Sequence, residues 1–237
     1  MNSRKYERCE LRVDFDSQFA VTSGWSDVSY KDQQVLKDDN NLPIIPKSTL
    51  IGMFRDSLLE LLRFSLFSEE RNKVCGAQYP DEKMGQDLCA MLDKTDDETC
   101  LVCRLCGSHW DERGHAWEDL QLVAETVLEK GNCSSEKGLI LYSDYSTTQV
   151  SHETGAALDK SLRSHEESAG VSFSGGLKFE FPLNEREARF LAMSFMNLKS
   201  IGSDKSSGLG RCHVSGTLFD TGNNPYPFTK IAGGNNG

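Results

Sequence analysis

Residues 202–211 read Gly-Ser-Asp-Lys-Ser-Ser-Gly-Leu-Gly-Arg and lead directly into a strand-like segment that contains Val214, Gly216 and Leu218. Glycine lets main-chain N–H groups approach a ligand because no side chain intervenes, and serine, lysine and arginine add donors that can follow a sugar-phosphate chain. A glycine- and serine-rich run is also typical of an ordinary turn. The stretch therefore predicts a phosphate-binding loop before the last strand, with a plain turn as the alternative.

A second informative stretch lies at residues 42–55. Pro46 stiffens its start and Ser48 is a favourable N-cap, so we expect a helix that begins close to residue 48 and ends in the charged run 69–71. The alternative interpretation is an ordinary amphipathic helix, because any such helix with a capped start shows this pattern. Apolar residues recur at helical spacing and predict one buried stripe, formed by Leu50, Ile51, Phe54, Leu58, Leu61 and Leu62.

Further strands and one more helix follow from the same kind of pattern. Alternation over 9–15 predicts the first strand, and 139–142 and 177–181 predict two more strands of the same sheet. Asn184 caps a helix in which Glu187 takes the capping-box position. The order strand, helix, strand, strand, helix, strand is that of a ferredoxin-like, RRM-like α+β fold.

The length of 237 residues allows one elaborated domain, and we expect residues 1–237 to form it. Within it, 72–118 lose apolar periodicity and gain Cys, Gly, Asp and Trp, which indicates an insertion outside the core. Residues 222–237 are rich in Gly and Asn and are expected to be a mobile tail. No apolar run approaches the roughly 20 residues of a membrane span and no signal-peptide pattern is present, so we expect a cytoplasmic protein.

The charge balance is unusual for a nucleic-acid binder, because 36 acidic residues outnumber 26 basic ones and the net charge is −10. The acidic residues cluster at 93–98 and 111–125, whereas Lys199, Lys205 and Arg211 bracket the glycine loop. The local field matters more for binding than the sum of charges. We therefore expect weak RNA binding by a single copy and stronger binding when several copies line one strand.

Five of the eight cysteines lie between residues 75 and 106, which in a cytosolic chain favours a structural zinc site over disulfides. The C-x-x-C at Cys100 and Cys103 has the spacing with which two thiolates bind one tetrahedral ion. Cys75 and Cys89 are the natural remaining ligands, and unliganded buried thiols are the alternative. Substitute ligands are Cys106, His109 and His115.

Taken together, the two stretches resemble the CRISPR-associated RAMP superfamily, in particular the backbone (repeat) subunit of type III effector complexes in its zinc-bearing variety. In that family a segment similar to I-P-G-S-S-L-K-G opens the first helix, and a loop that ends in G-L-G-R precedes the last strand. The first motif is matched by Ile45, Pro46, Ser48, Thr49, Leu50, Gly52 and Arg55. The second is matched by Gly202, Lys205, Ser206, Gly208, Leu209, Gly210 and Arg211. Lys47 and Ile51 stand where the family has Gly and Lys.

The middle of the chain carries the resemblance further. Residues 147–157 resemble the family's thumb-like hairpin, here 145–170, and 171–175 resemble its following strand. The resemblance thus implies a ferredoxin-like palm with a zinc-binding insertion at 72–118 and a thumb. Cys106 stands where zinc-bearing members usually have an aromatic residue, which makes it a weaker candidate ligand.

Asp32 is the candidate catalytic residue. The family's loop pattern D-x-x-V-x-[KR]-D is matched by Asp32, Val35, Lys37 and Asp38, and its first Asp is needed to cut target RNA. The resemblance implies cleavage that depends on Mg²⁺ or another divalent cation and leaves a 2′,3′-cyclic phosphate. Without the resemblance Asp32 is typical of a solvated loop acid, and Asp38 is the second choice.

The implied partners are a guide RNA (crRNA), complementary target RNA, further copies of the chain or related RAMP subunits, and other effector subunits, with no membrane. We expect a subunit that binds guide RNA and cleaves target RNA; the alternatives are a non-catalytic architectural subunit and a guide-precursor processing nuclease. The last usually needs a His-based site, and only His213 lies near the glycine loop. His152 and His165, in the expected thumb, are interpreted as structural or RNA-stacking residues. The expected RNA-binding positions are Lys47, Ser48, Thr49, Arg55, Gly202, Lys205, Ser206 and Arg211.

Overall fold

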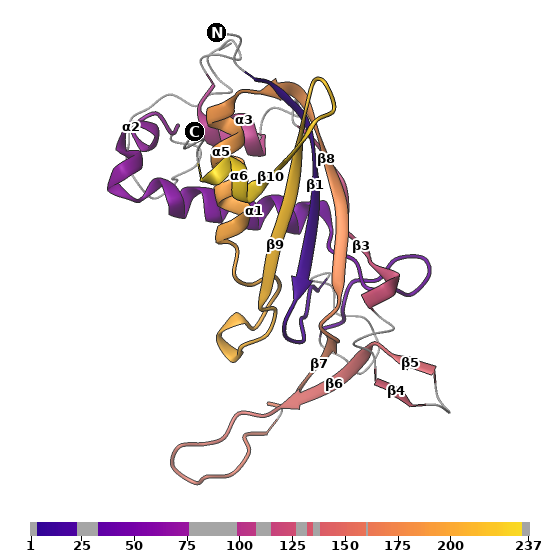
Figure 1. Ribbon diagram of the computed structural model, residues 1–237. Coiled ribbons are helices and arrows are strands. Elements are labelled where there is room, and N and C mark those ends of the chain that lie inside the picture. Colours follow the sequence, from indigo (N-terminus) through magenta and orange to yellow (C-terminus); the bar gives the residue numbers. More distant parts are fainter. Residues whose placement is uncertain are drawn as a thin grey trace.

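An antiparallel sheet forms the centre of the computed structural model, which describes residues 4–22, 33–75, 99–107, 115–126, 132–134, 138–159 and 161–233. Its strands run in the order β10-β9-β1-β8-β2, and β3 also pairs with β8. The expected α+β class is confirmed, since helices pack on this sheet (Figure 1). The strands are β1 (Tyr6–Phe15), β2 (Ala116–Trp117), β3 (Gln121–Leu122), β8 (Ser172–Leu183), β9 (Cys212–Asp220) and β10 (Pro225–Pro227).

Buried and exposed side chains alternate along β1, and this alternation shows which face of the sheet the helices cover. Cys9, Leu11, Val13 and Phe15 are buried, whereas Glu10 and Arg12 between them are exposed. This is the period of a strand that is half covered. The buried face lies under the helices α1 (Lys47–Leu62), α3 (Leu101–Cys106), α5 (Glu185–Asn197) and α6 (Phe228–Ala232).

Helix α5 begins as the sequence predicts. The Asn184 side chain accepts a hydrogen bond from the Glu187 N–H at 3.0 Å, and the Glu187 carboxylate accepts one from the Asn184 N–H at 2.9 Å. This capping box satisfies two amide donors that a helix end leaves without intrahelical partners. Helix α5 then packs on α1, where the rings of Phe54 and Phe195 lie 4.7 Å apart.

Helix α1 begins at Lys47, close to residue 48 as predicted, but its N-cap and its C-terminal end differ from the prediction. Its N-cap is Pro46 and not Ser48, and the carboxylate of Asp119 accepts the N–H of Lys47 at 2.7 Å. A distant loop thus supplies the capping oxygen. The helix ends at Leu62 because Phe64 is extended, so the run 69–71 belongs to a separate helix. Short helices η1 (Ser65–Phe67) and α2 (Ser68–Arg71) follow α1.

The prediction that 139–142 add a strand to the main sheet is wrong. Two separate pairs form in this region, β4 (Asn132–Ser134) with β5 (Gly138–Ile140), and β6 (Tyr142–Thr147) with β7 (Arg163–Ser168). The outer edge of β8 is occupied by β2 and β3. These strands have two residues each, which is too short for an alternation signal. The β6–β7 hairpin projects from the lower end of the sheet in Figure 1.

Two further expectations need correction. Within 72–118, Val102 and Leu105 are buried in the core and the ring of Trp117 lies 5.4 Å from that of Phe54, so the described part of the insertion is not outside the core. Within the expected mobile tail, β10 and α6 form, and Phe228 is buried. No helix in the described part of the chain is long and apolar enough to cross a membrane.

Candidate nucleic-acid interface and metal centre

The glycine loop is anchored to the segment that follows β1. The N–H of Gly210 donates to the carbonyl of Gln18 at 2.7 Å, and the N–H of Ser203 donates to the carbonyl of Ala20 at 2.8 Å. The loop also closes on itself, since the N–H of Ile201 donates to the Gly210 carbonyl at 2.8 Å. Both ends of the loop are therefore fixed to the segment that follows β1.

Three glycines in this loop have different roles. Gly202 and Gly210 have φ angles of +107° and +71°, and a Cβ atom would lie 2.5 Å from the Ala20 carbonyl oxygen at the first and 2.1 Å from the Ile201 carbonyl oxygen at the second. The space at these two positions is filled by the protein's own backbone. Gly208, with φ +87°, has no atom within 4 Å of its Cβ position. Of the three, only Gly208 leaves room for a ligand's backbone to approach.

These environments predict that two matched substitutions lower the free energy of unfolding by different amounts. Gly210→Ala is expected to destabilise the protein by about 2 kcal/mol or more, because it adds a backbone clash to an unfavourable φ. Gly208→Ala adds only the unfavourable φ and is expected to cost about 1 kcal/mol. Urea unfolding of the two variants beside the wild type measures the difference. Equal costs would show that the contact with Ile201 does not constrain the loop.

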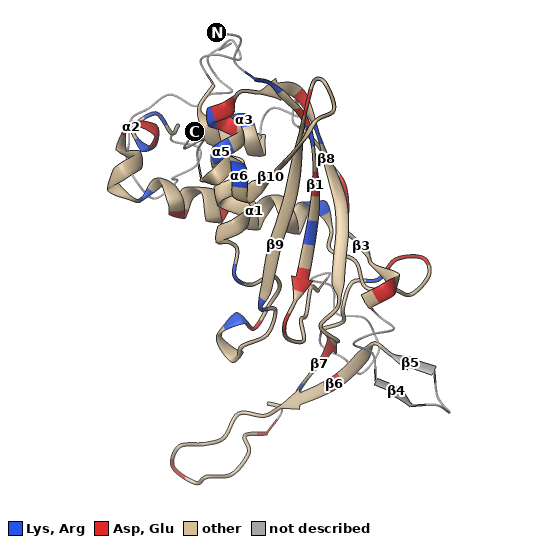
Figure 2. Cartoon of the chain, viewed as in Figure 1, with Lys and Arg blue, Asp and Glu red and all other residues tan. Residues whose placement is uncertain are grey.

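The middle of the loop, Asp204–Gly208, is exposed and carries the short helix η5 (Lys205–Ser207). Lys205 and Arg211 form no ion pair with any described residue. The backbone of Arg211 is fixed, since its N–H donates to the Ser17 hydroxyl at 2.9 Å, while its side chain is exposed. Figure 2 shows basic positions in and beside this loop, ahead of β9. The arrangement presents cations and hydroxyls from a rigid support, as a phosphate-binding surface requires.

The first turn of α1 lies at another edge of the sheet. Ile45 bridges to Leu120 beside β3, whereas the glycine loop precedes β9 on the far side of β1 and β8. Lys47 and Ser48 are exposed there, and Thr49 is partly buried. The structure thus places the two motifs on opposite sides of the central strands.

Arg55, also expected to bind RNA, turns instead toward α3. Its guanidinium donates to the Gly107 carbonyl at 3.4 Å. Burial raises the pKa of the neighbouring Cys106 thiol to about 12, although the positive charge of Arg55 acts in the opposite direction. The structure therefore associates Arg55 with the cysteine-bearing helix and not with the glycine loop.

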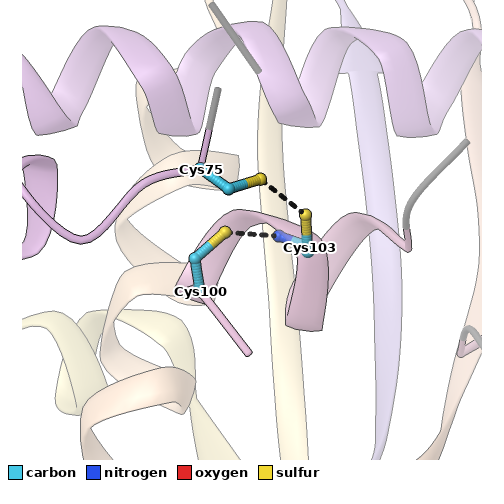
Figure 3. Close-up of side chains that lie close together, drawn as sticks. All are labelled: Cys75, Cys100 and Cys103. Carbon is cyan, nitrogen blue, oxygen red and sulfur yellow. Dashed lines mark hydrogen bonds between the residues drawn. The ribbon is translucent and has the colours of Figure 1, made fainter. Parts of the chain in front are cut away.

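Three of the four expected zinc ligands come together. Cys75, from the chain after α2, and Cys100 and Cys103, at the start of α3, are buried with all three sulfur atoms within 4.8 Å of one another (Figure 3). The Sγ atoms of Cys75 and Cys103 are 3.5 Å apart, and the Cys103 N–H donates to Cys100 Sγ at 3.5 Å. Thiolates around a tetrahedral zinc ion are separated by about 3.8 Å, as Zn–S bonds of about 2.3 Å require. The three thiols fit such an ion.

Of the other four candidate ligands, two lie in the part of the chain that the structure describes. Cys89 and His109 lie outside the described residues. Cys106 and His115 are described but do not belong to the cluster of three. His115 Nδ1 accepts the N–H of Glu180 at 3.3 Å, and burial, with the charge of Arg104, lowers its pKa to about 4, so its imidazole is neutral at pH 7.

Asp32 also lies outside the described residues, which resume at Gln33. The carboxylate of Asp38, the other acid of that motif, accepts the N–H groups of Asn40 and Leu42 at 2.9 and 2.8 Å. It caps its own turn, which is a structural role that the sequence interpretation missed. Asp and Asn commonly form such turns.

Comparison with known families agrees with this geometry, because a model of the RAMP superfamily matches residues 17–213. The chain belongs to the RAMP superfamily. The matched range runs from the segment that anchors the glycine loop to the start of β9, so it contains both motifs. RAMP membership identifies a CRISPR-associated RNA-binding protein. No curated protein matches the chain in sequence.

Sequence reasoning missed the residues that support the RAMP motifs. Asp119 caps α1, and Ser17, Gln18 and Ala20 hold the glycine loop. Three of these four contacts use the backbone of the glycine loop, and each joins segments far apart in the chain. No local pattern signals such contacts.

Proposed function

We propose that the chain is the guide-RNA-binding backbone subunit of a type III CRISPR effector complex, with a ferredoxin-like palm, a zinc-bearing insertion and a thumb-like hairpin. The observation that carries the proposal is the anchored glycine loop, from which the side chains of Lys205 and Arg211 are exposed to solvent. Lys205, Ser206 and Arg211 supply donors to the guide's phosphates, and Lys47 and Ser48 supply more at the start of α1. The first-turn N–H groups of Ser48 and Thr49 add to them, because such groups lack intrahelical partners, whereas the N–H of Lys47 already donates to the Asp119 carboxylate.

The strand order β9-β1-β8 followed by β2 supports the ferredoxin-like palm, with α1 and α5 as its two helices. The β6–β7 hairpin supports the thumb. Its strands and its tip expose large apolar side chains to solvent, which suits insertion between bases of the guide–target duplex. These side chains are Tyr145, Val150, Leu158 and Leu162.

The cysteine cluster is proposed to hold a structural Zn²⁺, with Cys89 as the fourth ligand. Four protein thiolates would leave no open coordination position, so the ion would stabilise the fold and take no part in the reaction. It would fix α3 against α1 and α5, the helices that α3 contacts.

The proposed activity is cleavage of complementary target RNA at Asp32. The Asp32 carboxylate accepts the proton of a ribose 2′-hydroxyl, whose oxygen attacks the adjacent phosphorus. The bond from phosphorus to the 5′-oxygen breaks, that oxygen takes a proton from solvent, and a 2′,3′-cyclic phosphate remains. A divalent cation such as Mg²⁺ would neutralise the charge that develops on the phosphate.

An architectural subunit that binds RNA without cutting it is the second candidate. The engagement of Asp38 in its own turn favours it, because that carboxylate is then committed to backbone donors. Cleavage by the assembled complex separates the two candidates.

RNA binding itself is tested by the double variant Lys205→Ala with Arg211→Ala. We expect it to retain less guide RNA, uniformly across guide sequences, with a salt dependence that flattens by about one unit of log slope for each lost phosphate contact. Filter binding across a salt series measures both quantities. The matched control, Arg189→Ala with Lys230→Ala, removes two exposed charges from α5 and α6 and should bind as wild type. If both double variants lose the same amount of RNA affinity, the effect comes from net charge and not from the position of the loop. If the loop variant loses no RNA affinity, the loop is not part of the RNA site.

A further inference from the structure

A pocket lies between α2, α5 and α6, on the helical side of the molecule. Its volume of about 500 Å³ falls within the range of roughly 300–1,000 Å³ that is typical of ligand pockets. The pocket is separate from the glycine loop, because Tyr226 in its wall pairs with Leu218 near the end of β9, whereas the loop precedes the first residue of that strand (Figure 1). We call it the α5–α6 pocket. Its apolar lining residues include Leu66, Phe67, Phe190, Met193, Tyr226 and Ile231.

One of these residues, Leu66, is 87 % exposed to solvent. It lies in the single 3₁₀ turn η1, in which successive side chains point about 120° apart. Phe67 turns inward onto Phe190, with the ring centroids 5.1 Å apart, and Leu66 and the nearby Phe64 remain on the surface. Large apolar side chains that are exposed together beside a pocket commonly mark an interaction site.

The charges around the pocket are predominantly positive, although the chain as a whole carries a net charge of −10. The two acidic side chains of the lining, Glu70 and Glu185, each pair with an arginine. Two further cations, Arg189 on α5 and Lys230 on α6, are exposed and form no ion pair within the part of the chain that the structure describes (Figure 2). They leave a local positive charge, and the local field determines which ligands a surface attracts.

The composition of the pocket suits a protein ligand better than RNA. Unpaired RNA bases stack on aromatic faces, but the Tyr226 ring already has the Arg4 guanidinium 4.4 Å and the Lys230 ammonium 5.5 Å from its centroid. Glu70 and Glu185 would also repel a continuous chain of phosphates. Protein interfaces, by contrast, are enriched in arginine, methionine and aromatic residues, and the pocket contains all three kinds.

We propose that the α5–α6 pocket binds an acidic segment of a partner protein that is not a copy of this chain. One or two large apolar side chains of that segment enter the pocket against Leu66 and Met193, and its carboxylates pair with Arg189 and Lys230. Apolar burial supplies affinity, and the charges select acidic segments and speed their association. The inference does not depend on the proposed RNA-binding function, because no residue of the pocket is among the expected RNA-binding positions.

The test uses a short fluorescent peptide in which a leucine–phenylalanine pair is flanked by glutamates, and fluorescence anisotropy measures its dissociation constant with the full chain. We expect Leu66→Ser, and separately the double variant Arg189→Ala with Lys230→Ala, to weaken binding about 10-fold or more. All three side chains are exposed, so their replacement should leave the fold intact. Added salt should weaken binding by the wild type and should affect the double variant less.

Two kinds of control accompany these variants. The glycine-loop double variant, Lys205→Ala with Arg211→Ala, removes the same number of positive charges elsewhere and should bind the peptide as wild type. Peptides in which serines replace the apolar pair, or lysines replace the glutamates, should bind the wild type about 10-fold more weakly or less tightly still.

Weaker peptide binding in both pocket variants, with wild-type binding in the glycine-loop variant, supports the proposal. Absence of peptide binding by the wild type, or equal binding by the wild type and the pocket variants, would overturn it. Equal binding of the serine-containing peptide would overturn it too, because the surface would then recognise charge alone.

Two further measurements on the pocket variants test other occupants. A loss of oligouridylate binding would assign the surface to RNA, and a loss of self-association in analytical ultracentrifugation would assign it to a second copy of the chain. Either result would overturn the proposed partner, whereas unchanged values in both measurements support it.

Discussion

Replacement of Asp32 by alanine is expected to abolish target cleavage while assembly and target binding stay intact. If the carboxylate accepts the 2′-hydroxyl proton or binds the cation, its removal acts on the transition state and lowers the rate by about 10²-fold or more. The measurement is single-turnover cleavage of matched RNA by the purified complex, with divalent cation and with chelator. Chelation is expected to stop the wild type as well.

Neighbouring acids supply the controls for this experiment. Asp39→Ala removes an exposed carboxylate from the same region and should cut at the wild-type rate. Asp38→Ala removes the cap of the 38–42 turn and is expected to lower stability more than rate. If Asp32→Ala cuts normally and Asp38→Ala does not, the motif match is shifted within the loop. If neither substitution matters, the architectural subunit is the correct reading.

The double variant Cys100→Ser with Cys103→Ser is expected to lose near-stoichiometric zinc and about 5 kcal/mol or more of stability. The effect should extend beyond the insertion, because Leu105 on the same helix is buried in the core of the domain. Metal analysis and thermal unfolding measure the two losses. Removal of zinc from the wild type by a strong chelator should lower the melting temperature in the same direction.

Cys106→Ser is the matched control, since Cys106 is a buried thiol on the same helix outside the cluster of three. It should keep its zinc. Loss of zinc from Cys106→Ser would make Cys106 the fourth ligand in place of Cys89. A wild-type protein without near-stoichiometric zinc, or an unchanged melting temperature in the double variant, would contradict the site.

Local signals explain what the sequence could predict about the fold. The alternation of β1 and the capping box of α5 involve residues within a few positions of one another, and both are confirmed. The start of α1 close to residue 48 is confirmed, but its capping carboxylate could not be predicted, because Asp119 is 72 residues away from Lys47. The insertion was placed outside the core for a similar reason, since Val102 and Trp117 pack against partners from other segments.

The candidate site also combines features that local sequence patterns predict with features that depend on contacts between distant segments. The C-x-x-C spacing brought Cys100 and Cys103 together as expected, because a helix start fixes that geometry. Its partner Cys75 could be named only from composition, and the structure places its sulfur next to that of Cys103. The requirement for glycine at 202 and 210 comes from close backbone contacts, which residue types alone do not show.

The anchoring of the glycine loop also dictates when during synthesis this surface can form. Its supports, Ser17 to Ala20, leave the ribosome nearly two hundred residues before the loop does, and contacts of such long sequence separation form late in folding. A nascent chain therefore cannot complete the anchored loop until residues as far as Arg211 have left the ribosome. If the loop binds RNA as proposed, translation products that stop before Arg211 would not compete for that RNA.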